Sequence, residues 1–194
     1  MAMKKKKSLP GPYATLTKDK RALLHDLLRD QSMKRVIVFT RTKHGANKVA
    51  EHLGKAGYIA DAIHGNKSQS ARQRALEGFR AGRARILVAT DIAARGIDID
   101  DVTHVVNFEL PDVAESYVHR IGRTARAGSG GIAIAFCDPS ERDSLRSIEK
   151  LVKQQLTAMG GDRHAPAAKP AREYAPDRSR QHPRDHRRNP RRAA

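Results

Sequence analysis

Cysteine and aromatic residues are scarce in this sequence. Its 194 residues include one cysteine and no tryptophan, and only 4% of them are aromatic. A single cysteine excludes a disulfide framework and a thiolate cluster for zinc, and it favours a reducing compartment. Cys137 follows an apolar run, so we expect it to be a small buried hydrophobe. The sequence predicts no metal site.

Long hydrophobic runs are also absent. No stretch approaches the roughly 18 apolar residues that a membrane span requires. The basic start is followed by Ser8-Leu9-Pro10-Gly11-Pro12, which lacks the apolar stretch of a signal peptide. These two absences indicate a soluble, cytoplasmic protein that has no membrane partner.

Acidic residues are outnumbered among the charged ones. There are 21 Asp and Glu against 38 Lys and Arg, which gives a formal net charge of +17. The surplus is +5 over residues 1–20 and +6 over residues 161–194, so more than half of it lies at the two ends. Basic arms on a mildly basic domain suit a polyanionic partner. Nucleic acid is the partner that this distribution favours.

Short apolar runs alternate with segments of helical periodicity along the chain. Strands are predicted over residues 35–40, 58–63, 86–90, 103–107 and 131–137. Helices are predicted over residues 18–31, 42–56, 70–81, 112–121 and from 140 onward. Ser140 and Asp143 are the expected cap of the last helix, and Leu156 is the last residue of its apolar stripe.

This alternation is typical of an α/β domain. We expect a doubly wound parallel sheet in three layers over residues 18–159. A basic flexible segment over residues 1–17 is expected to precede the domain. Past residue 160 the apolar pattern stops, so residues 160–194 are predicted to be a disordered Arg-rich tail.

Polar residues follow four of the predicted strands where each strand ends. They are Thr40-Arg41-Thr42, His64-Gly65, Thr90-Asp91 and Asn107-Phe108-Glu109. Ligands of open parallel sheets gather beyond the carboxyl ends of the strands. With Gln69 and Arg72 at a helix start, these groups predict an edge that binds phosphate without reading bases. Each residue alone has a structural alternative, such as a helix cap for a threonine or a satisfied surface position for His64.

A basic motif occupies residues 117–128, Tyr-Val-His-Arg-Ile-Gly-Arg-Thr-Ala-Arg-Ala-Gly. Its basic side chains are His119, Arg120, Arg123 and Arg126. The three arginines are spaced three residues apart, so on a helix they would form a row on nearly one face. Planar guanidinium groups suit phosphate oxygens, although a solvated basic face is the structural alternative.

Two motifs of a complete nucleotide site are missing from the sequence. There is no Gly-x-x-x-x-Gly-Lys-Ser/Thr loop, because Gly54-Lys55 is followed by Ala56 inside a predicted helix. There is also no Asp-Glu or Asp-Asp pair directly after a strand that could hold magnesium. Phosphate-facing arginines without these motifs indicate half of an active site.

Four of these segments resemble motifs of DEAD-box RNA helicases. Residues 91–98, Asp-Ile-Ala-Ala-Arg-Gly-Ile-Asp, and 119–126, His-Arg-Ile-Gly-Arg-Thr-Ala-Arg, are similar to motifs V and VI. Residues 36–43 resemble motif IV, and residues 64–72 resemble motif IVa. The resemblance covers about residues 18–155, in the family's order, and is nearest to the bacterial RhlE-like type. It implies the second, RecA-like domain of an ATP-dependent RNA helicase.

The resemblance also implies roles for individual residues. Arg123 and Arg126 would reach the γ-phosphate of ATP, with Arg126 as the arginine finger, and Asp98, beside Gly96, would bind the ribose. The residues that would line the RNA backbone path are Thr42, His64, Gly65, Gln69, Arg72 and Thr90. The residues that would link to the other domain are Arg95, His119 and Arg120.

The family's first RecA-like domain is the second implied partner, besides RNA. That domain supplies the phosphate loop and the Asp-Glu-Ala-Asp motif, and it would hold Mg²⁺ with ATP. This chain alone is therefore expected to be a monomer that binds RNA and does not hydrolyse ATP. A non-enzymatic RNA-binding or annealing module is the alternative, and half of a related DNA translocase is a third.

Two departures from the family pattern stand out. Ala125 replaces the usual glycine of motif VI, which would be strained only if that position requires a positive φ. The family usually has a strand just before the helix at Lys18, and residues 1–12 do not resemble one. We therefore expect a fragment, a truncated gene product or a misplaced start.

Overall fold

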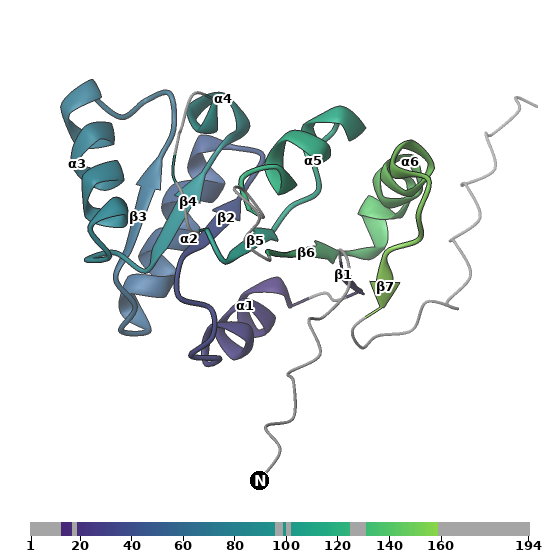
Figure 1. The fold of residues 1–194 in the computed structure, drawn as a ribbon, viewed down its shortest axis with the longest axis horizontal. Coiled ribbons are helices and arrows are strands. Elements are labelled where there is room, and N and C mark those ends of the chain that lie inside the picture. Colours follow the sequence, from purple (N-terminus) through teal and green to yellow (C-terminus); the bar gives the residue numbers. More distant parts are fainter. Residues whose placement is uncertain (1–12, 17–18, 96–98, 100–101, 125–130, 159–194) are drawn as a thin grey trace, which may run out of the picture.

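The computed structural model describes residues 13–16, 19–95, 99, 102–124 and 131–158 (Figure 1). The strands are β1 (Tyr13–Leu16), β2 (Val36–Phe39), β3 (Ala60–Ile63), β4 (Ile86–Ala89), β5 (His104–Asn107), β6 (Ile132–Cys137) and β7 (Thr157–Ala158). The helices are α1 (Lys20–Leu28), α2 (Lys43–Lys55), α3 (Gln69–Arg80), α4 (Asp91–Ala94), α5 (Ala114–Ile121), the 3-10 turn η2 (Pro139–Glu141) and α6 (Arg142–Val152). The strands form one sheet in the order β3-β4-β2-β5-β6-β1-β7, and each neighbouring pair is parallel.

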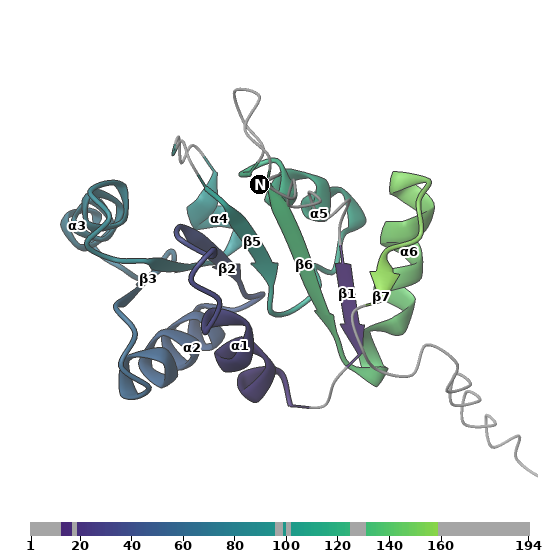
Figure 2. The same cartoon turned by 60° about the horizontal axis from the view of Figure 1, so that its bottom comes forward.

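Alternate residues of the central strands face opposite sides of the sheet, which produces three layers. In β2, Val36 and Val38 pack with α1 and α2, whereas Ile37 and Phe39 pack with α3 and α4. Beyond β5, α5 and α6 cover the same face as α3 and α4, against β6 (Figure 2). Strands covered on both faces need apolar side chains at every position, which explains their continuous apolar runs. The predicted three-layer α/β architecture is confirmed.

Two helices begin with side-chain caps directly after strand ends. Thr42 Oγ1 accepts a hydrogen bond of 2.9 Å from the backbone N–H of Gly45, at the start of α2. Ser68 Oγ accepts one of 3.2 Å from the N–H of Ala71, at the start of α3. These caps satisfy backbone donors that have no partner within a helix, so they set where each helix leaves the carboxyl edge of the sheet.

Three expectations about the elements are wrong. Tyr13–Leu16 is a strand that pairs with both β6 and β7, although no strand was expected before Lys18. The cap of the last helical segment is Asp138, which exchanges hydrogen bonds with the turn that contains Glu141, and not Ser140 with Asp143. Leu156 lies beyond the end of α6, although its side chain is buried.

Candidate functional site at the carboxyl edge of the sheet

The polar strand ends lie side by side at one edge of the sheet, as the sequence predicts. Thr40, after β2, donates its backbone N–H to the carbonyl of Ala89 at 3.0 Å. Thr90, after β4, donates its N–H to the carbonyl of Ile63 at 3.3 Å. The ends of β3, β4 and β2 are therefore neighbours, and their loops lie over a single edge.

A first cleft lies on this edge, and we call it the strand-end cleft. Its lining residues are Arg41, Lys43, Gly65, Asn66, Thr90, Asp91 and Ile92. Of the residues predicted to line an RNA path, Gly65 and Thr90 belong to this lining. Thr42 lies between two lining residues, and its hydroxyl caps α2. Lys43 and Asn66, which the sequence analysis did not select, add a cation and an amide to the cleft.

His64 is held inside the fold and is only 3% exposed. Its Nδ1 accepts a hydrogen bond of 3.3 Å from the N–H of Asn66, so the proton of the neutral ring is on Nε2. Nε2 lies 2.9 Å from Asn47 Oδ1, to which it then donates. Burial, followed by the charges of Lys67 and Lys43, lowers the pKa of His64 below its ordinary value. The neutral ring of His64 therefore fixes the loop at Gly65. The ring is buried and is not exposed for contact with a ligand.

Gln69 and Arg72 lie at the start of α3, where the sequence places them. Arg72 donates from one guanidinium nitrogen to Gln69 Oε1 at 3.3 Å and from the other to the carbonyl of Ala93 at 3.5 Å. The second bond joins α3 to α4, which carries one wall of the strand-end cleft. Gln69 is exposed, while Arg72 is half-buried. Neither residue is among the lining of the strand-end cleft.

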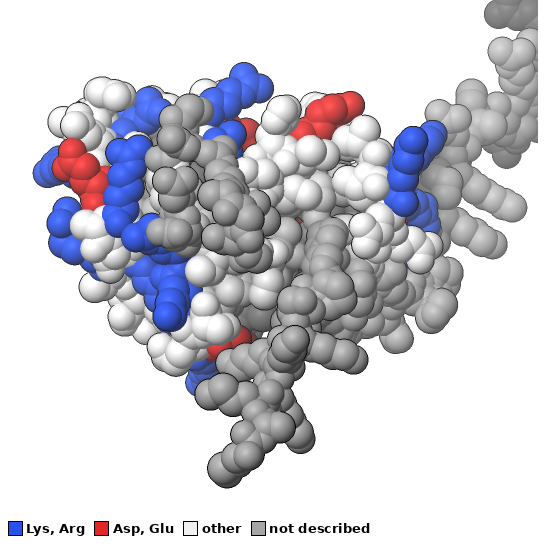
Figure 3. All heavy atoms as spheres, viewed as in Figure 1, with Lys and Arg blue, Asp and Glu red and all other residues white. Residues whose placement is uncertain are grey.

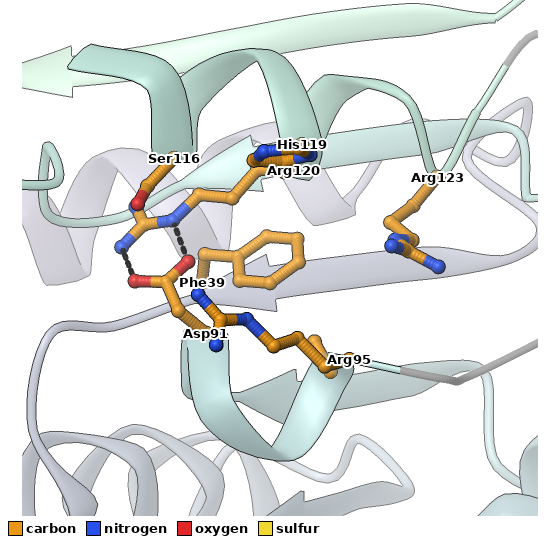
Figure 4. Close-up of a pocket in the computed structure, with 8 residues that line it drawn as sticks. Phe39, Asp91, Arg95, Ser116, His119, Arg120 and Arg123 are labelled. Carbon is orange, nitrogen blue, oxygen red and sulfur yellow. Dashed lines mark hydrogen bonds and ion pairs between the residues drawn. The ribbon is translucent and has the colours of Figure 1, made fainter. Parts of the chain in front are cut away.

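A second cleft lies between α4 and α5, and we call it the interhelix cleft. Its lining residues are Phe39, Asp91, Ala94, Arg95, Ser116, His119, Arg120 and Arg123 (Figure 4). Arg95 and His119 are exposed, and Arg123 is half-buried. The side chains of Arg95 and Arg123 extend into the space between the two helices. Four predicted site residues, Arg95, His119, Arg120 and Arg123, therefore line one cleft, with Ser116 as a hydroxyl that the sequence did not single out.

Arg120 does not belong to an outward-facing row. Its side chain is 1% exposed, and its guanidinium forms a two-bond ion pair with Asp91, at 2.6 and 2.8 Å (Figure 4). It also donates to Asn107 Oδ1 at 3.1 Å and to the carbonyl of Glu109 at 2.7 Å, and it stacks over the ring of Phe39. All these partners lie within the domain and hold Arg120 inside it, so its contact with the other domain stays a prediction.

Arg120 and Arg123 do not form a row on one helix face, because α5 ends before Arg123. The helix ends at Ile121, with Gly122 as its C-cap, so Arg123 follows the last helical turn. Spacing along the sequence alone does not reveal that the partner of Arg120 is Asp91, which comes from a different strand end. Asp91 lines both clefts, whereas Arg120 lines only the interhelix cleft.

Three predicted residues of the nucleotide site, Gly96, Asp98 and Arg126, lie outside the described residues, as does Ala125. Among the residues that the structure describes, no group of three His, Cys, Asp or Glu could hold a metal ion. Within the same ranges no helix is long and apolar enough to cross a membrane.

Comparison with known proteins gives consistent matches. A family model described as the helicase conserved C-terminal domain matches residues 19–128. The DEAD-box ATP-dependent RNA helicase CshA of Bacillus subtilis (strain 168) is 50% identical over 133 residues, which cover 69% of this chain and 27% of that protein. CshA of Geobacillus kaustophilus (strain HTA426) is 49% identical over 142 residues, which cover 73% of this chain and 30% of that protein. The chain thus spans less than a third of the length of these relatives.

Solved structures agree with these matches. The E. coli DEAD-box protein SrmB, solved in complex with the regulator of ribonuclease activity A, superimposes with a TM-score of 0.74 at 38% identity. That match covers 77% of this chain and 90% of the SrmB chain. A DEAD box protein from Methanococcus jannaschii gives a TM-score of 0.71 at 37% identity, over 79% of this chain and 42% of that one.

The family model covers more than half of the chain and includes every lining residue of both clefts. The finer RhlE-like assignment stays a prediction. The chain belongs to the helicase conserved C-terminal domain family, in the RecA-like form that DEAD-box RNA helicases contain.

Proposed function

We propose that this chain acts as the C-terminal half of an ATP-dependent RNA helicase. It would bind the RNA backbone in the strand-end cleft and present arginines from the interhelix cleft to ATP, which a first RecA-like domain holds. The observation that carries the proposal is that Asp91 lines both clefts, while its ion pair with Arg120 joins α4 to α5. We expect occupancy of one cleft to affect the other through this residue.

The composition of the strand-end cleft suits a phosphodiester backbone. Lys43 supplies a point charge, Asn66 an amide, and Thr90 a hydroxyl, while the exposed backbone at Gly65 has no side chain that would block approach. Such groups would contact phosphate and sugar, which carry no information on base sequence. We therefore expect RNA binding with little base preference.

The interhelix cleft suits the phosphates of a nucleotide. Arg95, His119 and Arg123 provide cationic or hydrogen-bonding groups on its rim, and Ser116 adds a hydroxyl. When ATP is bound, the transferred phosphoryl group is stabilised mainly by positioned charge, and an arginine delivered by domain closure contributes roughly 10³ to 10⁵ in rate. Arg123 and Arg126 would supply that charge, and Asp98 with Gly96 would bind the ribose. Mg²⁺ would be held by the first domain.

The test joins this chain to a first RecA-like domain of CshA type and measures ATP hydrolysis with and without RNA. We expect RNA-dependent turnover in the joined protein and none above background in the chain alone, because its sequence lacks the phosphate loop. If the joined protein binds RNA and nucleotide but shows no turnover, and this chain anneals RNA by itself, the non-enzymatic module is the better reading.

A further inference from the structure

Arg41 occupies an unusual position at the strand-end cleft. It lines the cleft beside Lys43, but its guanidinium turns to acidic groups on the neighbouring loop and on η2. It donates to Asp112 Oδ1 at 3.2 Å and lies 3.8 Å from Glu141 Oε1. Its backbone N–H donates to Glu109 Oε2 at 2.7 Å. The backbone of Arg41 is therefore fixed, and only the side chain has alternative partners.

The two carboxylates that face the guanidinium differ in their surroundings. Glu141 is 3% exposed, is already paired with Lys20, and accepts the N–H of Leu110 at 3.1 Å. Asp112 is 79% exposed, and the Arg41 side chain that it pairs with is 38% exposed. Exposed ion pairs contribute little, because water screens both charges. Asp112 is thus the weaker partner and the one that a phosphate in the cleft could replace.

We propose that Arg41 is a further phosphate-binding residue of the strand-end cleft, and that Asp112 holds it away from the cleft until RNA enters. The inference rests on the proposed function, because it takes an RNA phosphate as the competing anion. Burial alone would lower the pKa of Arg41, but the hydrogen bond to Asp112 and the charges of Glu141 and Glu109 raise it. The guanidinium therefore stays charged and is available to either anion.

Exchange of Asp112 for an RNA phosphate as the partner of Arg41 predicts the direction in which RNA affinity changes. Neutralising Asp112 removes the competing anion, so RNA binding in the cleft should become tighter. The gain should be about two- to fivefold at low salt, which corresponds to the strength of an exposed pair. A cation newly engaged with a phosphate also releases counterions, so the salt slope for a single strand should steepen by about 0.7.

The experiment uses the full ¹⁵N-labelled chain and a short single-stranded oligouridylate. Amide signals of Gly65 and Thr90 report occupancy of the strand-end cleft separately from any binding by the basic ends. Asp112→Asn is compared with Asp143→Asn, which makes the same change of charge on α6, where Asp143 pairs with Arg146 and is 92% exposed. We expect tighter binding and a steeper slope in Asp112→Asn, and neither change in Asp143→Asn.

The double variant Arg41→Ala/Asp112→Asn separates release of Arg41 from a simple change of local charge. The gain should disappear in an Arg41→Ala background if Arg41 binds the phosphate. A gain that persists there, or an Asp112→Asn protein that binds like the wild type, would overturn the inference while leaving the RNA cleft in place. If the Gly65 and Thr90 signals respond to RNA in no variant, both the inference and the proposed RNA site are wrong.

Discussion

Arg120 is the largest side chain that is fully buried among the described residues, and its charge must be balanced inside the domain. Asp91 provides the balance from α4, and Asn107 and the carbonyl of Glu109 accept the remaining hydrogen bonds. Removing one partner of a buried pair leaves an uncompensated charge, which costs more than the pair contributes. The ion pair that joins α4 to α5 therefore depends on this single carboxylate.

Asp91→Asn should lower the free energy of unfolding by about 3 kcal/mol. This lies at the lower end of the cost of breaking a buried pair, because the Asp91 side chain is 34% exposed and water screens part of the loss. Urea denaturation followed by circular dichroism measures the change. Asp143→Asn is the control, since its pair with Arg146 is exposed and should contribute almost nothing. Equal stability of the two variants would show that Arg120 finds another anion.

His64 should make stability depend on pH. The folded protein holds its pKa below the ordinary 6.5, so the neutral ring is favoured in the folded state. Its contribution to stability is complete above about pH 6.5 and is lost as the pH falls through the folded pKa, because the unfolded chain then binds a proton more readily. His104, whose pKa burial also lowers, contributes in the same direction.

His64→Gln should therefore reduce stability at pH 7.5 and flatten its decline towards pH 5. Thermal or urea midpoints at several pH values measure both effects. His119, which is exposed on α5 and is not among the charges that act on His64, offers the control His119→Gln, for which we expect neither change. An unchanged pH profile in His64→Gln would assign the decline to His104 or to carboxylates.

At the scale of elements, the strands that were predicted correctly are those covered on both faces. Val36–Phe39 and Ile86–Ala89 are buried at every position, so their apolar runs are unmistakable in the sequence. Tyr13–Leu16 was missed because its pairing partners, around Ile134 and Thr157, are more than a hundred residues away. The pattern of residues within this short segment does not indicate that it pairs with such distant strands.

The same distinction applies to the candidate site. Strand-end residues such as Thr90 and Gly65 were found because parallel topology brings strand ends together. The burial of Arg120 was not found, because it depends on Asp91 lying opposite α5 at a particular distance. The predicted cap at Ser140 is wrong because a 3-10 turn, η2, precedes α6. Asp138 and Glu141 form the capping box of that turn, whereas α6 has no side-chain cap.

Glu141 connects α1 with the loops that follow β2, β5 and β6, so its loss should exceed that of an ordinary helix cap. Its carboxylate pairs with Lys20 of α1, accepts the N–H groups of Leu110 and Asp138, and faces Arg41. Glu141→Ala should lower the free energy of unfolding by about 3 kcal/mol, because it leaves the buried N–H of Leu110 unpartnered and leaves Lys20 paired only with Asp138, which is 31% exposed.

Asp138→Ala is the matched comparison, since it removes the cap from the same turn together with the longer, more exposed pair with Lys20. We expect a cost of about 1 kcal/mol for that loss, measured by the same denaturation experiment. If the two variants lose equal stability, Glu141 acts only as part of the cap, and its contacts with Lys20 and Leu110 contribute little.

At the scale of the whole molecule, the positive charge is distributed unevenly. On the face shown in Figure 3, the Lys and Arg side chains gather mainly over α3, β3 and β4. Residues 161–194 carry +6 of the net charge of +17 and lie outside the described residues, so their predicted disorder stays a prediction. Two sources of RNA affinity, the domain and the tail, should therefore be separable by their dependence on salt.

A chain that ends at Met159 should bind RNA more weakly than the full chain, with a shallower salt slope. The ten basic residues beyond residue 160 would each release counterions when they meet phosphates, without preference for sequence. Fluorescence anisotropy with an oligouridylate across a salt series measures both quantities. Equal affinities and equal slopes would exclude the tail from RNA binding.

The last prediction concerns the arginines of residues 119–126 in the protein joined to a first RecA-like domain. Arg126→Lys keeps the charge but loses the planar fork that suits phosphate oxygens. We expect kcat of the RNA-dependent ATPase to fall at least about a hundredfold, from the size of arginine-finger effects, with little change in melting temperature. Arg120→Lys is the contrasting variant. Lysine cannot reproduce the bonds to Asp91, Asn107 and Glu109, so this variant should lose stability.

The two variants together separate a catalytic arginine from a structural one. Steady-state turnover and thermal unfolding are measured on each, at saturating RNA and ATP. If Arg126→Lys lowers the melting temperature and leaves kcat intact, the residue belongs with Arg120 in the framework of the domain. In that case the charge that reaches the nucleotide would have to come from Arg123, whose side chain already extends into the interhelix cleft.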